Sequence, residues 1–160
     1  MSPNKLACLA LIAWSTGCAQ WSGDGDVVSN TYQSFQNASQ KRAFESGWLP
    51  KALPKSSTNI MEAHNIDSGE LWLKFHCAVN DIRTFTRSCT PDTRARFPDP
   101  KRTSRNAPWW PKELTGDGDA HLPKHWQVMS CASMNHAEGL VSANIAIDTH
   151  KNAIWYWIVK

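Results

Sequence analysis

The sequence predicts an α+β domain with a single antiparallel sheet of about five strands and two helices packed on one face. Three observations support this class. Residues 29–46 carry apolar side chains near helical spacing, residues 71–77 alternate in polarity, and residues 126–159 contain three strand-like segments. The expected order is therefore helix, two strands, helix, long loop and three strands.

The first helix is expected over residues 29–46, the segment SNTYQSFQNASQKRAFES. Ser29 or Asn30 can accept a hydrogen bond from a free backbone N–H and cap the first turn. Gly47 offers the left-handed conformation that ends many helices. The apolar stripe of this helix consists of Tyr32, Phe35, Ala38, Ala43 and Phe44.

A hairpin is expected next, because two strand-like segments flank the turn signal Asp67-Ser68-Gly69. In the second segment, residues 71, 73, 75 and 77 are apolar and share one face, which is typical of a half-buried antiparallel strand. A short helix over residues 79–88 should follow, with Val79, Ile82 and Phe85 about one turn apart.

A proline- and arginine-rich loop is expected at about residues 90–120, where no helical or strand periodicity is visible. Between Arg87 and Lys112 there are seven basic and two acidic side chains. A loop of this length in a compact domain is usually functional or mobile. It can be a solvated surface loop, or a basic surface that attracts anionic partners.

The C-terminal part is expected to be three strands. Residues 126–133 alternate in polarity, and residues 139–148 and 152–160 flank the turn Thr149-His150-Lys151. The last segment is almost entirely apolar, so we expect it to be central in the sheet or covered on both faces.

Residues 1–17 are expected to be a short leader rather than a membrane span. Residues 1–17 have one positive charge, Lys5, before an apolar run of about nine residues, which suits a secretory signal and is shorter than the roughly 20 residues a bilayer requires. The sequence STGC resembles a bacterial lipobox, which implies lipidation of Cys18 and, with Ala19 after it, a place on the periplasmic face of the outer membrane. Residues 18–28 would be a flexible tether and residues 29–160 a single domain. Cleavage after Ala19, giving a soluble secreted or periplasmic protein, is the alternative.

Three cysteines remain in the domain, namely Cys77, Cys89 and Cys131. An oxidising compartment permits one disulfide. A helix between Cys77 and Cys89 would separate them by about 15 Å, whereas bridged Cα atoms rarely exceed about 7 Å. The sequence therefore favours a Cys89–Cys131 disulfide, with Cys77 as a buried apolar residue.

The sequence contains none of the common catalytic or nucleotide-binding motifs. His121 and His125 are four residues apart, but Pro123 disrupts a helical metal pair. We expect no cofactor and no metal. The net charge of +3 is too balanced for a general nucleic-acid-binding protein.

One arrangement could support acid–base chemistry. Glu62 and His64 would share one face of the first hairpin strand, and His76 could lie across the hairpin from them. The alternative is a structural hydrogen-bonded pair that holds the strand register.

A resemblance extends over residues 43–67. This segment is similar to a motif of secreted or lipid-anchored bacterial proteins without an assigned activity, G-W-[LI]-P-x-x-[LV]-P-x-S-A-x-x-I-x-x-x-H-[DN]-x-D. Ser57 replaces the usual Ala. The resemblance implies a location and a fold relationship, not a reaction. The matching positions are Gly47, Trp48, Leu49, Pro50, Leu53, Pro54, Ser56, Ile60, His64, Asn65 and Asp67.

Two functions follow as hypotheses. The favoured one is a membrane-anchored, non-catalytic lipoprotein that binds a protein or an anionic envelope component, and an immunity protein or inhibitor is one form of it. The alternative is a small secreted hydrolase-like enzyme that uses Glu62, His64 and His76. The binding candidates are Trp48, His64, Asp67, Arg94, Arg96, Arg102, Arg105, Trp109 and Trp110.

Overall fold

The computed structural model describes residues 26–92, 94–116, 122–136 and 139–159. The signal peptide expected at residues 1–17, the lipidation site Cys18 and most of the tether lie outside these ranges. Among the described helices, none has the length and apolar character to cross a bilayer.

The fold is a seven-stranded antiparallel sheet, and the expectation of about five strands is wrong. Every strand pairs antiparallel with its neighbours. The spatial order is β1 (Val27–Ser34), β2 (Thr58–Asn65), β3 (Leu71–His76), β7 (Ala153–Ile158), β6 (Gly139–Asp148), β5 (Trp126–His136) and β4 (Cys89–Pro91).

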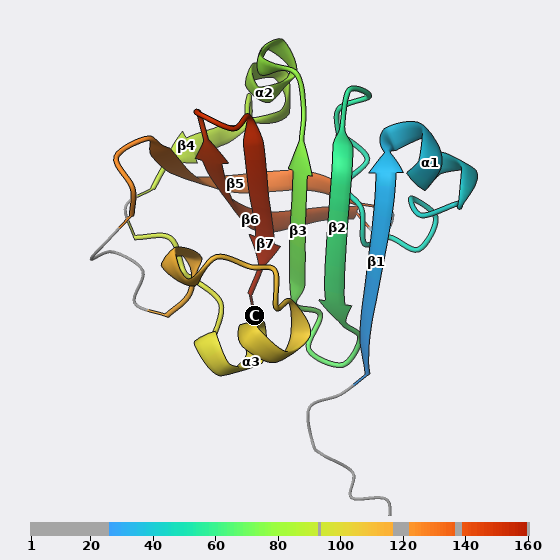
Figure 1. Cartoon of the computed structure of the whole chain (residues 1–160), viewed down its shortest axis with the longest axis horizontal. Coiled ribbons are helices and arrows are strands. Elements are labelled where there is room, and N and C mark those ends of the chain that lie inside the picture. The colour runs from blue at the N-terminus through green and yellow to red at the C-terminus, as the bar shows by residue number, and fades with distance from the viewer. Residues whose placement is uncertain (1–25, 93, 117–121, 137–138, 160) are drawn as a thin grey trace, which may run out of the picture.

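Helices are short and do not form the expected layer of two on one face. Figure 1 shows α1 beside the end of β1 and α2 beyond the end of β3, whereas α3 lies against one face of the sheet. The helical elements are α1 (Phe35–Gln40), α2 (Val79–Phe85), α3 (Pro100–Asn106) and the 3-10 turn η1 (Lys112–Leu114). Within the described residues the chain is therefore mostly sheet.

The helix expected at residues 29–46 is instead strand β1 followed by α1. The side chain of Tyr32 is buried and Val28 and Asn30 are half-buried, while the side chains between them are exposed, which is the period-two pattern of a strand. The hydroxyl of Ser34 accepts the Asn37 N–H at 3.1 Å, so the helix begins at Phe35, six residues later than expected. The apolar pattern of this segment fits either a helix or a strand, and backbone pairing with β2 makes it a strand.

The expected loop at residues 90–120 contains three regular elements, namely the end of β4, α3 and η1. The three-residue strand β4 has no visible sequence pattern, but Cys89 lies directly opposite Cys131 in β5. These two residues form the expected disulfide, which is confirmed, and Cys77 is a buried free thiol.

The two C-terminal hairpin strands and the β2–β3 hairpin form as expected. Strand β7 is central, between β3 and β6, and residues 153–157 are all buried. The prediction that the last strand is central or covered on both faces is confirmed.

The sheet curls strongly, so that β5 and β6 cross behind β2 and β3 (Figure 1). This curl creates two apolar clusters. The inner cluster, which includes Leu73, Phe75 and Tyr156, lies between the crossing strands. The outer cluster, which includes Trp72 and Trp157, lies on the opposite face beneath the segment of residues 95–114.

The inner face is closed by the segment that follows α1. The Lys51 N–H donates to the Asn135 carbonyl at 2.8 Å, which ties this segment to the end of β5. Leu49 and Leu53 are almost fully buried in the inner cluster. This segment contains Pro50 and Pro54, which restrict its backbone, and we call it the proline-braced segment; it is an ordered part of the core.

Candidate functional site

A cavity of about 750 Å³ lies beside the outer cluster, and three of the predicted binding arginines line it. This volume is within the usual range for small-ligand sites. We call it the arginine cleft. Its lining residues include Arg94, Arg96, Arg102, Glu70, Phe97 and Asp99.

Alternation along an extended segment places two of these arginines on the cleft. Ala95 is buried and Phe97 is half-buried, whereas Arg94 and Arg96 between and beside them are exposed. The Phe97 ring stacks on Trp157 with a centroid distance of 5.5 Å. The Arg96 carbonyl accepts the Trp157 indole N–H at 2.7 Å. The backbone that carries the arginines is therefore held at two points on a buried tryptophan.

The third arginine is held by a buried acid. The Arg102 guanidinium donates to the Glu70 carboxylate at 2.8 Å, and the Ser68 hydroxyl donates to the same oxygen at 3.0 Å. The hydrogen bond to Glu70, together with its charge, raises the pKa of Arg102. Asp99 caps α3 by accepting the Arg102 N–H at 2.9 Å. Both acids of the cleft thus have structural partners.

Arg94 and Arg96 differ from Arg102 in this respect. Within the described residues, no ion pair holds either guanidinium. Two exposed guanidinium groups on a fixed backbone can bind an anion through bidentate hydrogen bonds. The electrostatic balance of the cleft therefore leaves positive charge available at its Arg94–Arg96 side.

The structure does not bring the other predicted basic and aromatic residues into this cleft. Arg105 is exposed in the last turn of α3 and does not line it. Trp110 is buried and donates its indole N–H to the Leu114 carbonyl at 2.9 Å. Trp109 is half-buried and stacks on Trp155. Both tryptophans pack with the outer cluster.

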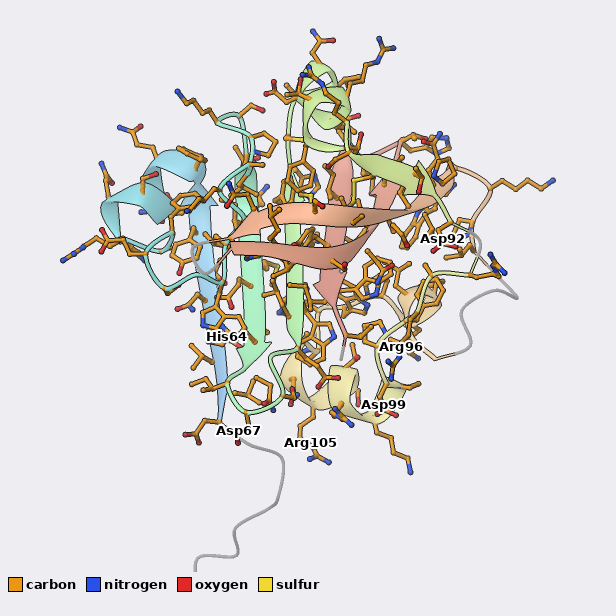
Figure 2. All side chains as sticks on the ribbon, turned by 180° about the vertical axis from the view of Figure 1, so that it is seen from behind. His64, Asp67, Asp92, Arg96, Asp99 and Arg105 are labelled. Carbon is orange, nitrogen blue, oxygen red and sulfur yellow. A yellow bond between two sulfur atoms is a disulfide. The ribbon has the colours of Figure 1, made fainter. Side chains whose placement is uncertain are left out.

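Trp48, His64 and Glu62 form a separate group on the inner face. The His64 ring stacks on Trp48 with a centroid distance of 3.8 Å, and its Nδ1 contacts the Glu62 carboxylate. The other Glu62 oxygen accepts the Asn30 amide N–H at 2.8 Å. Glu62 is 2% and His64 4% exposed. Figure 2 shows His64 on the side of the molecule away from Arg96 and Asp99.

The three-residue acid–base cluster expected from the sequence is not formed. In the hairpin register Glu62 lies opposite Leu73, so both side chains are on the inner face. His76 is three residues further and points to the other face, where it lines a different cavity of about 360 Å³. Asp67 is exposed in the β2–β3 turn, just beyond the end of β2 that carries His64 (Figure 2).

A second buried hydrogen-bonded group, formed by Gly47, His136 and Tyr156, lies on the inner face and was not predicted from the sequence. His136 Nδ1 lies 2.9 Å from the Gly47 carbonyl, and its Nε2 lies 2.7 Å from the Tyr156 hydroxyl. The first ring nitrogen therefore donates and the second accepts from tyrosine. Burial lowers the pKa of His136 and raises that of Tyr156. Only the curl of the sheet brings these three residues together.

Metal ligation has no support in the described part of the chain, where no three His, Cys, Asp or Glu side chains gather around one point. The expectation of no metal site stays a prediction, because residues 117–121, which include His121, lie outside the description.

Comparison with known proteins matches part of the chain to a protein family. Residues 26–76 are similar to the family model of the YbbD head domain, a bacterial family. No curated protein and no solved structure matches the chain. The matched segment covers β1, α1, β2 and β3, so it includes Trp48, Glu62 and His64. Of the arginine cleft it includes only Glu70. The similarity therefore concerns the buried inner-face group, and the cleft is built almost entirely by the rest of the chain.

Proposed function

We propose that this protein is a non-catalytic binding module of the bacterial cell envelope, and that the arginine cleft holds an anionic ligand. The observation that carries the proposal is the pair Arg94 and Arg96. Their guanidinium groups are exposed on a cavity of about 750 Å³, and no ion pair with a described residue neutralises them.

The site favours binding because its backbone is already ordered. Phe97 and the Arg96 carbonyl are both held by Trp157, which is fully buried. A preorganised site loses less conformational entropy when a ligand binds. The acids offset the attraction only in part, because three arginines and two carboxylates, Glu70 and Asp99, line the cleft, and Glu70 is paired with Arg102.

The positions of the candidate acid–base residues also favour a binding role. Glu62 and His64 are buried beneath Trp48, and His76 lies on the opposite face. A hydrolase would need its acid–base groups within reach of substrate. The enzymatic alternative, which requires Glu62, His64 and His76 together, is therefore disfavoured.

The proposed location is the periplasmic face of the outer membrane, with a lipid on Cys18 as the anchor. The bacterial family similarity supports a bacterial source. Intact-mass measurement of the purified native protein tests the anchor. A chain that begins at Cys18 and carries diacylglycerol supports it, whereas an unmodified chain beginning at Gln20 indicates a soluble secreted protein.

Calorimetric titration with inorganic phosphate tests the binding proposal. A charge-assisted hydrogen bond contributes about 1.5–3 kcal/mol, so R94Q/R96Q should weaken phosphate binding about tenfold or more. R83Q/R87Q removes the same charge from exposed positions outside the cleft and is the matched control. Equal weakening by both pairs would mean that net charge, not the cleft, attracts the anion.

A further inference from the structure

A second cavity, of about 430 Å³, adjoins the arginine cleft. The two cavities share Arg94 and Phe97 as lining residues. We call the second one the aromatic cavity. It is lined by Pro91, Asp92, Arg94, Phe97, Leu122, Trp126 and Val128.

The aromatic cavity is apolar except at Asp92 and Arg94. Asp92 accepts the Ser130 hydroxyl at 2.6 Å and the Arg94 N–H at 2.8 Å. The hydrogen bond from Ser130 is the main reason that the pKa of Asp92 is lowered. This carboxylate is therefore ionised and already has partners, and it borders the cavity without requiring a polar ligand group.

The aromatic walls are held from behind. Phe97 stacks on Trp157, and Trp126 stacks on Trp155 with a centroid distance of 6.2 Å. Both supporting tryptophans are buried. These stacking contacts hold the two aromatic walls of the cavity against the outer cluster. Its volume lies within the range of ligand pockets.

We propose that the ligand is a single-chain anionic amphiphile, with its anionic head in the arginine cleft and its alkyl chain in the aromatic cavity. This inference rests on the proposed function and names the ligand class of the same site. The juxtaposition is specific, because Arg94 borders both cavities and can contact the head while the chain passes Phe97. A small hydrophilic anion would fill only the cleft and leave the apolar walls exposed to water.

The test is a chain-length series of monoalkyl phosphates, from inorganic phosphate to butyl, hexyl and octyl phosphate, titrated below the concentrations at which micelles form. Each buried methylene contributes enough to raise affinity about fourfold. We expect affinity to increase with chain length in the wild-type protein. R94Q/R96Q should weaken every member of the series, inorganic phosphate included.

Val128→Thr keeps the side-chain shape but replaces one methyl group of the cavity wall with a hydroxyl. Leu122→Ala shortens another side chain of the wall. Both should reduce the gain per methylene while leaving inorganic phosphate unchanged. Val141→Thr is the matched control for the first variant, because Val141 is also half-buried on a strand but packs against the inner cluster. Leu140→Ala, at a residue that is 70% exposed, is the control for the second.

The outcomes separate the two proposals. If octyl phosphate binds no more tightly than inorganic phosphate, the amphiphile inference is wrong and the anion-binding proposal stands. If the gain with chain length is the same in Val128→Thr, Leu122→Ala and their controls, the chain lies elsewhere and the inference is also wrong. If no member binds, both proposals fail.

Discussion

His136 is an example of how one buried residue couples distant parts of the chain. It lies in β5, donates to the Gly47 carbonyl before the proline-braced segment and accepts from Tyr156 in β7. The residue is 4% exposed, and its burial lowers the pKa of the imidazole. The neutral ring is therefore the form that the folded protein stabilises.

This coupling predicts acid-dependent stability. Because the folded protein binds the His136 proton more weakly than the unfolded chain, this stability is fully present above about pH 6.5. It decreases as the pH falls toward the lowered folded-state pKa. We expect the thermal midpoint of the wild-type protein to fall between pH 7.5 and pH 5.5.

His136→Asn should have a flatter dependence of the midpoint on pH, although its midpoint is lower at pH 7.5. His150→Asn, at an exposed position, should retain the wild-type slope. Thermal unfolding followed by far-ultraviolet circular dichroism measures all three proteins. Parallel slopes for the wild type and His136→Asn would show that another group controls the acid response.

At the scale of elements, strand β4 is attached to the sheet by a disulfide as well as by backbone pairing with β5. It has only three residues, pairs with β5 alone and forms one edge of the sheet. The disulfide from Cys89 to Cys131 closes a loop with a sequence separation of 42. This loop includes α3, η1 and the arginine cleft segment, so the disulfide restricts the part of the unfolded chain that carries the proposed site.

Removal of this disulfide should therefore lower the free energy of unfolding. The chain-entropy relation gives about 4 kcal/mol for a loop of this length. Urea unfolding of the double variant C89A/C131A measures the loss. Cys77→Ala is the control, because it removes a buried thiol without opening the loop. A loss below about 1 kcal/mol would mean that the unfolded chain keeps this loop compact.

At the scale of the whole molecule, the two halves of the chain share one core. Strand β3, at the end of the segment similar to the YbbD head domain, pairs with β7 near the C-terminus. On the outer face, Trp72 donates to the Thr103 hydroxyl at 3.2 Å. On the inner face, Leu73 packs in the same cluster as Tyr156. The side chains on both faces of β3 are therefore covered by residues beyond position 76.

We predict from this arrangement that residues 26–76 alone do not fold. An isolated sheet of three strands with both faces uncovered is at best marginally stable. A proton–nitrogen correlation spectrum of the fragment should show narrow amide dispersion, whereas that of residues 26–160 should be well dispersed. A dispersed fragment spectrum would show that this segment is an independent unit.

Local patterns in the sequence determined the β2–β3 and β6–β7 hairpins, the central place of β7 and the helix that begins at Val79, although this helix ends at Phe85 and not at residue 88. Each depends on short-range alternation, helical spacing or a tight turn. The sequence also favoured the disulfide that forms, because the helix after Cys77 disfavours a Cys77–Cys89 pair, but it did not exclude Cys77–Cys131. These features need no knowledge of which distant segments meet.

Only the tertiary structure decided the rest. Residues 29–34 fit a helix or a strand until β2 pairs with them, and β4 is too short to show a periodicity. The hairpin register placed His76 away from Glu62, and the curl of the sheet joined His136 to Gly47. Packing on Trp157 oriented Arg94 and Arg96 toward a cavity that Arg105 does not reach. Sequence patterns report which side chains prefer burial, whereas the strand register and the curl determine which of them meet.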